Sequence, residues 1–136
     1  MNKRMVIFLF SLLLLIGCNG NKIKRNTELE KDINSSIIMV SDNSESEVNI
    51  KDLANFEWDK AFLINPYTPQ EEIEKQVGVN FKDPSNISSR DDIYLLIFLN
   101  NGKVVQYAEI NRLQTSFNLA DKEYLTPSND LMNIKR

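Results

Sequence analysis

A continuous apolar run followed by a tight-turn dipeptide constrains the fold of this chain more than any other segment. Residues 93–99 read Ile-Tyr-Leu-Leu-Ile-Phe-Leu, and Asn101-Gly102 follows after a single residue. A strand that is apolar on both faces belongs in the middle of a sheet, and Asn-Gly favours a two-residue type I′ turn. The pattern therefore predicts an antiparallel hairpin of residues 93–99 and 103–110, with its first strand central and a helix on one side.

A two-residue turn also fixes which residues of this hairpin lie opposite each other. Leu99 should pair with Val104, and the ladder should then continue residue for residue. The other expected pairs are Phe98 with Val105, Ile97 with Gln106, Leu96 with Tyr107, Leu95 with Ala108, Tyr94 with Glu109 and Ile93 with Ile110. A three-residue loop starting at Asn100 is the alternative, and it would change these pairs.

Residues 68–78 carry the signals of one amphipathic helix. Thr68–Glu71 read Thr-Pro-Gln-Glu, a capping box in which the threonine hydroxyl accepts from the glutamate N–H and Pro69 is the first helical residue. Ile73 and Val77 are four residues apart and therefore share a face toward the core. Gly78 is the expected stop.

The remaining segments predict shorter elements. Two strands are expected at residues 37–40 and 58–64, a short helix at 49–55, and two C-terminal strands within 117–125 and 131–134. The sum is a small two-layer α+β domain over residues 36–136. It should contain an antiparallel sheet of three to five strands with one or two helices packed on one face.

The N-terminus has the layout of a secretory signal. Lys3 and Arg4 supply positive charge, residues 5–16 are apolar apart from Ser11, and Gly17 is a small residue at the end of the run. Twelve apolar residues make a helix of about 18 Å, whereas a spanning helix needs roughly 20 residues. We therefore expect residues 1–17 to be removed rather than retained as an anchor.

Leu15-Ile16-Gly17-Cys18 resembles the lipobox of bacterial lipoproteins processed by the lipoprotein signal peptidase. The resemblance implies cleavage between Gly17 and Cys18, a diacylglycerol on the Cys18 thiol, and further acylation by chains such as palmitate. Two or more acyl chains hold a protein stably on a membrane. The expected location is the exported side of the cell membrane or outer membrane. The alternative is an ordinary signal peptide with an incidental cysteine.

Residues 19–35 are polar and lack a sustained apolar period. We expect residues 18–35 to be a lipidated polar tether, helical at most transiently around residues 28–33. A flexible segment of this length reaches roughly 20–25 Å. The globular domain should then fold independently from about Ser36.

Composition excludes several classes of function. Removal of Lys3 and Arg4 leaves 14 basic side chains against 19 acidic ones, a net charge of −5. A dispersed acidic charge argues against nucleic acid as a partner. The chain has no histidine, so it lacks the commonest general base and metal ligand. With Cys18 acylated, we expect no disulfide, no metal site and no cofactor.

Carboxylates and hydroxyls are the remaining candidates for chemistry. Glu57 and Asp59 flank Trp58, and Asp91-Asp92 precede the central strand. Sequence neighbours on a strand point to opposite faces, and charge is usual at the start of a strand. Four glycines, none in a nucleophile-elbow or phosphate-loop pattern, leave no motif for a hydrolase or nucleotide site. We therefore expect no enzyme activity.

Two aromatic residues are candidates for contact with a partner. Tyr67 lies between Pro66 and Thr68-Pro69 in a stiff loop, where it can present an anchor to another protein. The alternative is a hydrophobic staple in which Tyr67 packs on the helix that follows. Trp58 is the second candidate, with a place in the core as the favoured alternative.

The segment W-D-K-A-F-L-I-N-P-Y-T-P-Q-E-E-I-E-K-Q-V-G, from Trp58 to Gly78, is similar to one in small bacterial lipoproteins with no assigned activity. The Thr-capped, glycine-ended helix followed by antiparallel strands also resembles the small lipoprotein of the outer-membrane β-barrel assembly machinery. These resemblances imply a non-catalytic binding or assembly-support module with an unknown protein partner. An envelope enzyme using carboxylates or hydroxyls, and an inhibitor or immunity-type protein, are the alternatives.

Overall fold

A computed structural model describes residues 23–40 and 44–136, which form the α+β domain that the sequence predicts. The elements are β1 (Lys24–Arg25), α2 (Thr27–Ile38), β2 (Glu45–Asn49), α3 (Ile50–Leu53), β3 (Lys60–Ile64), α4 (Gln70–Val77), the 3-10 helix η1 (Ile87–Ser89), β4 (Ile93–Asn100), β5 (Lys103–Asn111), β6 (Ser116–Asn118) and β7 (Leu131–Lys135). No helix in this described part of the chain is long and apolar enough to cross a membrane.

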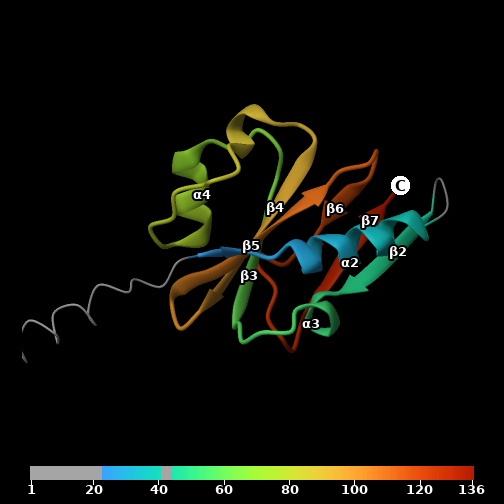
Figure 1. The fold of residues 1–136 in the computed structure, drawn as a ribbon, viewed down its shortest axis with the longest axis horizontal. Helices are drawn as coiled ribbons and strands as arrows, with labels where there is room; N and C mark the ends of the chain where they lie inside the picture. The colour runs from blue at the N-terminus through green and yellow to red at the C-terminus, as the bar shows by residue number, and fades with distance from the viewer. Residues whose placement is uncertain (1–22, 41–43) are drawn as a thin grey trace, which may run out of the picture.

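The strands form two sheets (Figure 1). The larger sheet has the order β1-β5-β4-β3, and all its pairs are antiparallel except β1 with β5. The smaller one has the order β2-β7-β6 and is antiparallel throughout. The prediction that residues 93–99 form a central strand is confirmed, because β4 lies between two neighbours and is buried over those residues.

Two hydrophobic cores lie on opposite faces of the larger sheet. One is enclosed by α2, α3 and the smaller sheet, and takes Leu96 and Phe98 from β4. The other lies beneath α4 and the segment that follows it, and takes Leu95 and Ile97 from β4. Helices therefore cover both faces, and the smaller sheet adds a covering layer that the sequence patterns did not indicate.

Helix α2 corrects the expected tether. The Asn26 side chain accepts a hydrogen bond from the Leu29 N–H at 2.9 Å and caps the helix. Leu29, Ile33 and Ile37 are buried along one face of the helix. The prediction of a flexible tether is thus wrong from residue 24 onward, and residues 37–40 end this helix instead of forming a strand. The domain therefore includes residues 24–35, which the sequence pattern had assigned to the tether.

Helix α4 confirms part of its prediction. Ile73 and Val77 are buried, and Gly78 ends the helix in the left-handed conformation with φ +79°. The capping box is wrong: the N-cap is Pro69, and the Thr68 hydroxyl donates to a carbonyl in the preceding turn. A proline ring fixes φ but offers no side-chain acceptor, so the start of α4 has no side-chain cap.

The β4–β5 hairpin has the expected turn and a different register. Asn101 and Gly102 have φ values of +52° and +74°, as a type I′ turn requires, and Leu99 pairs with Val104. A bulge then shifts the ladder by one residue. The pairs beyond the bulge are Phe98 with Gln106, Ile97 with Tyr107, Leu96 with Ala108, Leu95 with Glu109, Tyr94 with Ile110 and Ile93 with Asn111.

The shift has a packing reason. It moves Ala108 and Ile110, which are both fully buried, onto the side of the sheet that faces α2. Without the bulge, Ala108 would lie opposite Leu95 and face the other core. The six expected pairs beyond Leu99 are therefore wrong, because burial against α2 outweighed a regular ladder.

Candidate functional site

The structure separates the two aromatic candidates. Trp58 is only 6% exposed and its ring packs edge-to-face on Phe98, with 5.4 Å between ring centroids. It is a core residue and is not available to a partner. Tyr67 is 60% exposed, so its ring does not form the staple that the alternative required. Gly17 and Cys18 lie outside the described residues.

Tyr67 is held in an unusual backbone conformation. Its φ is +64°, in the left-handed region, which costs a residue with a Cβ roughly 1–2 kcal/mol. Its N–H donates to the carbonyl oxygens of Ile87 at 3.0 Å and Arg90 at 3.2 Å. These two bonds fix the strained residue to the segment before β4, so the ring projects from a rigid support.

The loop around Tyr67 is stiff in its own right. Between β3 and α4, the Thr68 hydroxyl donates to the Asn65 carbonyl at 2.7 Å and the Thr68 N–H donates to the same oxygen at 3.3 Å. Pro66 and Pro69 fix φ on either side. Residues 65–69 therefore present the tyrosine with little conformational entropy left to lose on binding.

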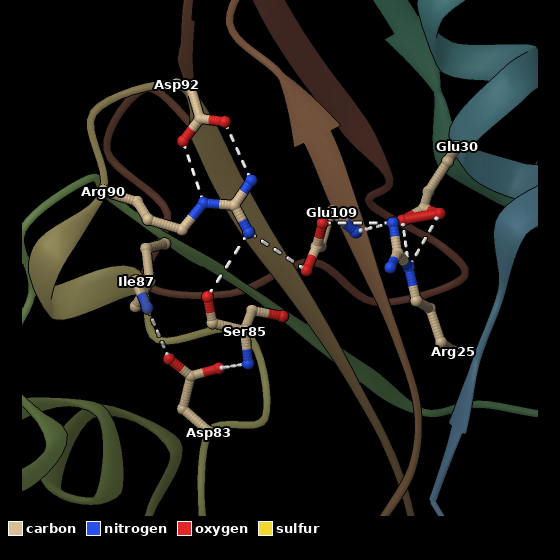
Figure 2. A network of polar contacts seen from close by, with 8 residues as sticks. All are labelled: Arg25, Glu30, Asp83, Ser85, Ile87, Arg90, Asp92 and Glu109. Atoms are coloured by element: carbon tan, nitrogen blue, oxygen red, sulfur yellow. Dashed lines mark hydrogen bonds and ion pairs between the residues drawn. The ribbon is translucent and has the colours of Figure 1, made fainter.

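A second set of bonds holds the supporting segment, residues 83–92 (Figure 2). The Asp83 carboxylate accepts from the N–H groups of Ser85 and Ile87, each at 2.8 Å. This is an Asx-type arrangement in which a side chain replaces backbone partners in a turn. Since Ile87 provides a carbonyl to Tyr67, Asp83 helps to position Tyr67 without touching it.

Arg90 ties this segment to the sheet (Figure 2). Its guanidinium donates to both Asp92 carboxylate oxygens, at 2.9 and 2.8 Å, and to the Ser85 carbonyl at 3.3 Å. The hydrogen bond between Arg90 and Asp92 lowers the pKa of Asp92, and the same bond raises the pKa of Arg90. The same guanidinium lies 3.4 Å from the Glu109 carboxylate on β5.

Glu109 connects Arg90 to a second arginine. Arg25 of β1 lies 3.0 Å from the Glu109 carboxylate and donates to Glu30 of α2 at 2.9 Å. Glu30 also accepts from the Glu109 N–H at 2.9 Å. Charges therefore alternate along this network, and each carboxylate has a partner. Such an arrangement orders the structure and leaves no unengaged acid or base in it.

The other carboxylates considered for chemistry do not converge. Asp59 accepts from the Asn101 N–H at 2.9 Å beside the hairpin turn, while Asp92 binds Arg90 at the far end of β4. Among residues 23–40 and 44–136, no three histidine, cysteine, aspartate or glutamate side chains gather closely enough to hold a metal ion.

A second exposed apolar residue lies at the same end of the larger sheet as Tyr67. Leu113 is 48% exposed, and it and Gln114 have φ values of +43° and +58°. The turn closes with a bond from the Thr115 N–H to the Arg112 carbonyl at 2.6 Å. The Arg112 N–H donates to the Asp92 carbonyl at 2.9 Å, which ties this turn to the segment that supports Tyr67.

We call residues 65–69, 87–92 and 111–115 the loop face. It contains two exposed apolar side chains on left-handed residues, and a shallow hollow of about 560 Å³ lies beside Leu113. Backbone strain of this kind persists where the surroundings impose it and clusters at functional sites. The sequence did not point to Leu113 or Arg90. No local pattern predicts a leucine in the left-handed conformation, or an ion pair between Arg90 and Glu109, which are 19 residues apart.

Comparison with known proteins adds no relative: no family model, no curated protein and no solved structure matches this chain.

Proposed function

We propose that this protein is a lipid-anchored component of the bacterial cell envelope that binds a protein partner through the loop face and catalyses no reaction. The observation that carries the binding proposal is Tyr67, an aromatic side chain that is 60% exposed on a strained, doubly hydrogen-bonded residue. Rigid exposed aromatics are the residues that most often dominate the binding energy of an interface.

The position of β1 supports an outward-facing orientation of the loop face. Lys24 of β1 lies opposite Gln106 in a parallel pair, so the chain enters the sheet from the side of the β4–β5 hairpin turn. Five residues lie between Cys18 and Lys24, so the six steps along the chain reach at most about 20 Å. A lipid on Cys18 would therefore keep the hairpin end of the domain near the membrane.

The loop face lies at the other end of the same strands. Residues 93–100 of β4 run from the loop face to the hairpin turn, a length of about 25 Å at 3.3 Å per residue. Tyr67 and Leu113 would then point away from the lipid, where a partner in the envelope can reach them.

The lipid anchor is tested by replacing Cys18. The Cys18→Ala chain should remain an uncut precursor without acyl groups, whereas mass spectrometry of the native protein should show a polypeptide that starts at Cys18 with diacylglycerol attached. Normal processing of the variant would contradict the anchor.

The binding site is tested by photo-crosslinking in intact cells. A photoreactive amino acid placed at position 67 or 113 should give the same discrete adduct with a second protein. Position 103, exposed next to the hairpin turn, is the matched control and should give none. Adducts of equal yield at all three positions would contradict a specific loop face.

A further inference from the structure

The free edge of β2 offers a second interaction surface, separate from the loop face. In the sheet order β2-β7-β6, β2 pairs only with β7 (Figure 1). The Ile50 N–H donates to the Asp130 carbonyl at 3.1 Å, and the Arg136 N–H donates to the Ser44 carbonyl at 3.2 Å. Residues of an antiparallel strand alternate in the edge to which they bond, so even-numbered residues of this segment bond to β7.

The odd-numbered residues of β2 therefore direct their backbone groups away from β7. Glu45 and Glu47 present N–H and C=O groups to the free edge, and their side chains are exposed. Asn49 adds only its N–H, because it is the N-cap of α3 and its C=O accepts the first hydrogen bond of that helix. An edge of this kind is a template for another strand. The outward N–H and C=O groups of Glu45 and Glu47, with the Asn49 N–H, can accept a short extended segment by strand addition.

A groove runs along this edge. It has a volume of about 540 Å³ and is formed by the end of α2, by β2 and by α3. Met39, which is 85% exposed, and Val40 and Leu53 contribute apolar surface to it. Side chains of an added strand that point toward the core would meet this surface, and methionine adapts well to varied apolar partners.

The charge around the groove selects the occupant. Among the described residues that line it, Glu45, Glu47 and Asp52 are acidic and none is basic. The Arg136 guanidinium donates to the carbonyl oxygen of Val40, another lining residue, at 3.1 Å. In the described part of the chain, Glu45 faces Lys135 of β7 at 3.8 Å, whereas Glu47 and Asp52 take part in none of the ion pairs found there. Acidic side chains on an edge disfavour a second copy of the same edge, and cross-strand pairs of opposite charge favour a basic partner.

We propose that the free edge of β2 binds an extended basic segment of another protein as an additional strand. Its basic side chains would lie beside Glu45 and Glu47 on the exposed face of the sheet. Its alternate, apolar side chains would enter the groove next to Met39 and Leu53. The recognised pattern is therefore an alternation of basic and apolar residues over about five positions.

The test uses the full chain in a non-ionic detergent and a fluorescent seven-residue peptide that alternates lysine and valine. Fluorescence anisotropy should show saturable binding of this peptide and none of a glutamate–valine peptide. Glu47→Lys should weaken binding about tenfold, since a favourable cross-strand charge pair becomes unfavourable. Glu72→Lys makes the same charge change on exposed α4 and should leave binding unchanged.

Two further peptides separate strand pairing from simple charge attraction. One carries N-methyl groups on its lysines and the other on its valines. Because only alternate N–H groups of an added strand face β2, one methylated peptide should lose binding and the other should keep it. If both peptides bind, or neither does, the proposal is overturned.

Amide exchange gives a readout that depends on no variant. In the free protein the amides of Glu45, Glu47 and Asn49 should exchange quickly, while those of Ser46 and Val48 are already protected by β7. The lysine–valine peptide should slow the first three. Failure to do so overturns the proposal, as does protection that rises with protein concentration alone, which would assign the edge to a second copy of this chain.

Discussion

Replacing Ile33 with alanine should destabilise the domain severely, although this residue lies in a segment whose composition is that of a polar linker. Ile33 is fully buried on the face of α2 that it shares with Leu29 and Ile37. Large-to-small changes of this kind in a packed core cost about 2–5 kcal/mol, because the transfer free energy is lost and a cavity remains. That is a large part of the 5–15 kcal/mol typical of a small domain.

The matched control lies five residues further along the same helix. Ile38 is 69% exposed, so Ile38→Ala should change the free energy of unfolding by no more than about 0.5 kcal/mol. Both variants lose the same atoms from the same helix. Only their burial differs, which makes the comparison a direct test of α2 packing.

Urea unfolding followed by circular dichroism measures the difference. With a urea dependence of about 1.5 kcal/mol per molar, a loss of about 3 kcal/mol lowers the midpoint of Ile33→Ala by roughly 2 M. The midpoint of Ile38→Ala should stay within about 0.3 M of the parent. Equal midpoints for the two variants would show that α2 does not pack on the domain. They would support the prediction that this segment is a flexible tether.

Four further outcomes are expected. A chain starting at Ser36 loses the buried faces of Leu29 and Ile33, worth about 3–6 kcal/mol together, and should be unfolded by circular dichroism; a folded spectrum would contradict this. Tyr67→Gly should raise the free energy of unfolding by about 1 kcal/mol, since glycine tolerates a φ of +64°. The same variant should abolish the partner adduct formed from position 113. Tyr67→Ala should also abolish this adduct, but without the gain in stability. Gly78→Ala should cost about 1 kcal/mol in a thermal melt, because its φ is +79°. The folded-state pKa of Asp92 is lowered by Arg90, so the pair stabilises the fold fully above the ordinary carboxyl pKa near 4 and ceases to do so as the pH falls through the lowered value. Asp92→Asn should therefore lower the melting temperature at pH 6, by an amount that shrinks as the pH falls below about 4. Asp91→Asn should leave the melting temperature unchanged at both pH values.

Signals carried within a few neighbouring residues were readable in the sequence. The Asn101-Gly102 turn, the apolar run that became β4, and the glycine stop of α4 all depend on local chemistry, and all three are confirmed. The capping box is the local exception. Its pattern was present, but Pro69 occupies the cap and the Thr68 hydroxyl bonds backward.

Features that depend on distant residues were not readable. The apolar stripe of α2 has only one member in each turn, and its last member falls beyond the boundary drawn at Ser36, so the polar exposed face dominated the composition. The hairpin bulge is set by the burial of Ala108 beneath α2, not by the turn. Tyr67 was singled out from its sequence, but its strain and its bonds to Ile87 and Arg90 required the fold.

Strand β4 supplies alternate side chains to both cores, Leu96 and Phe98 to one and Leu95 and Ile97 to the other. Because both cores pack on β4, unfolding of either core removes packing that holds this strand, and loss of the strand removes part of the other core. Despite its two sheets, the protein should therefore lose structure in a single all-or-none transition, with identical melting curves for the fluorescence of Trp58, which lies in one core, and for circular dichroism, which follows the helices and strands around both cores.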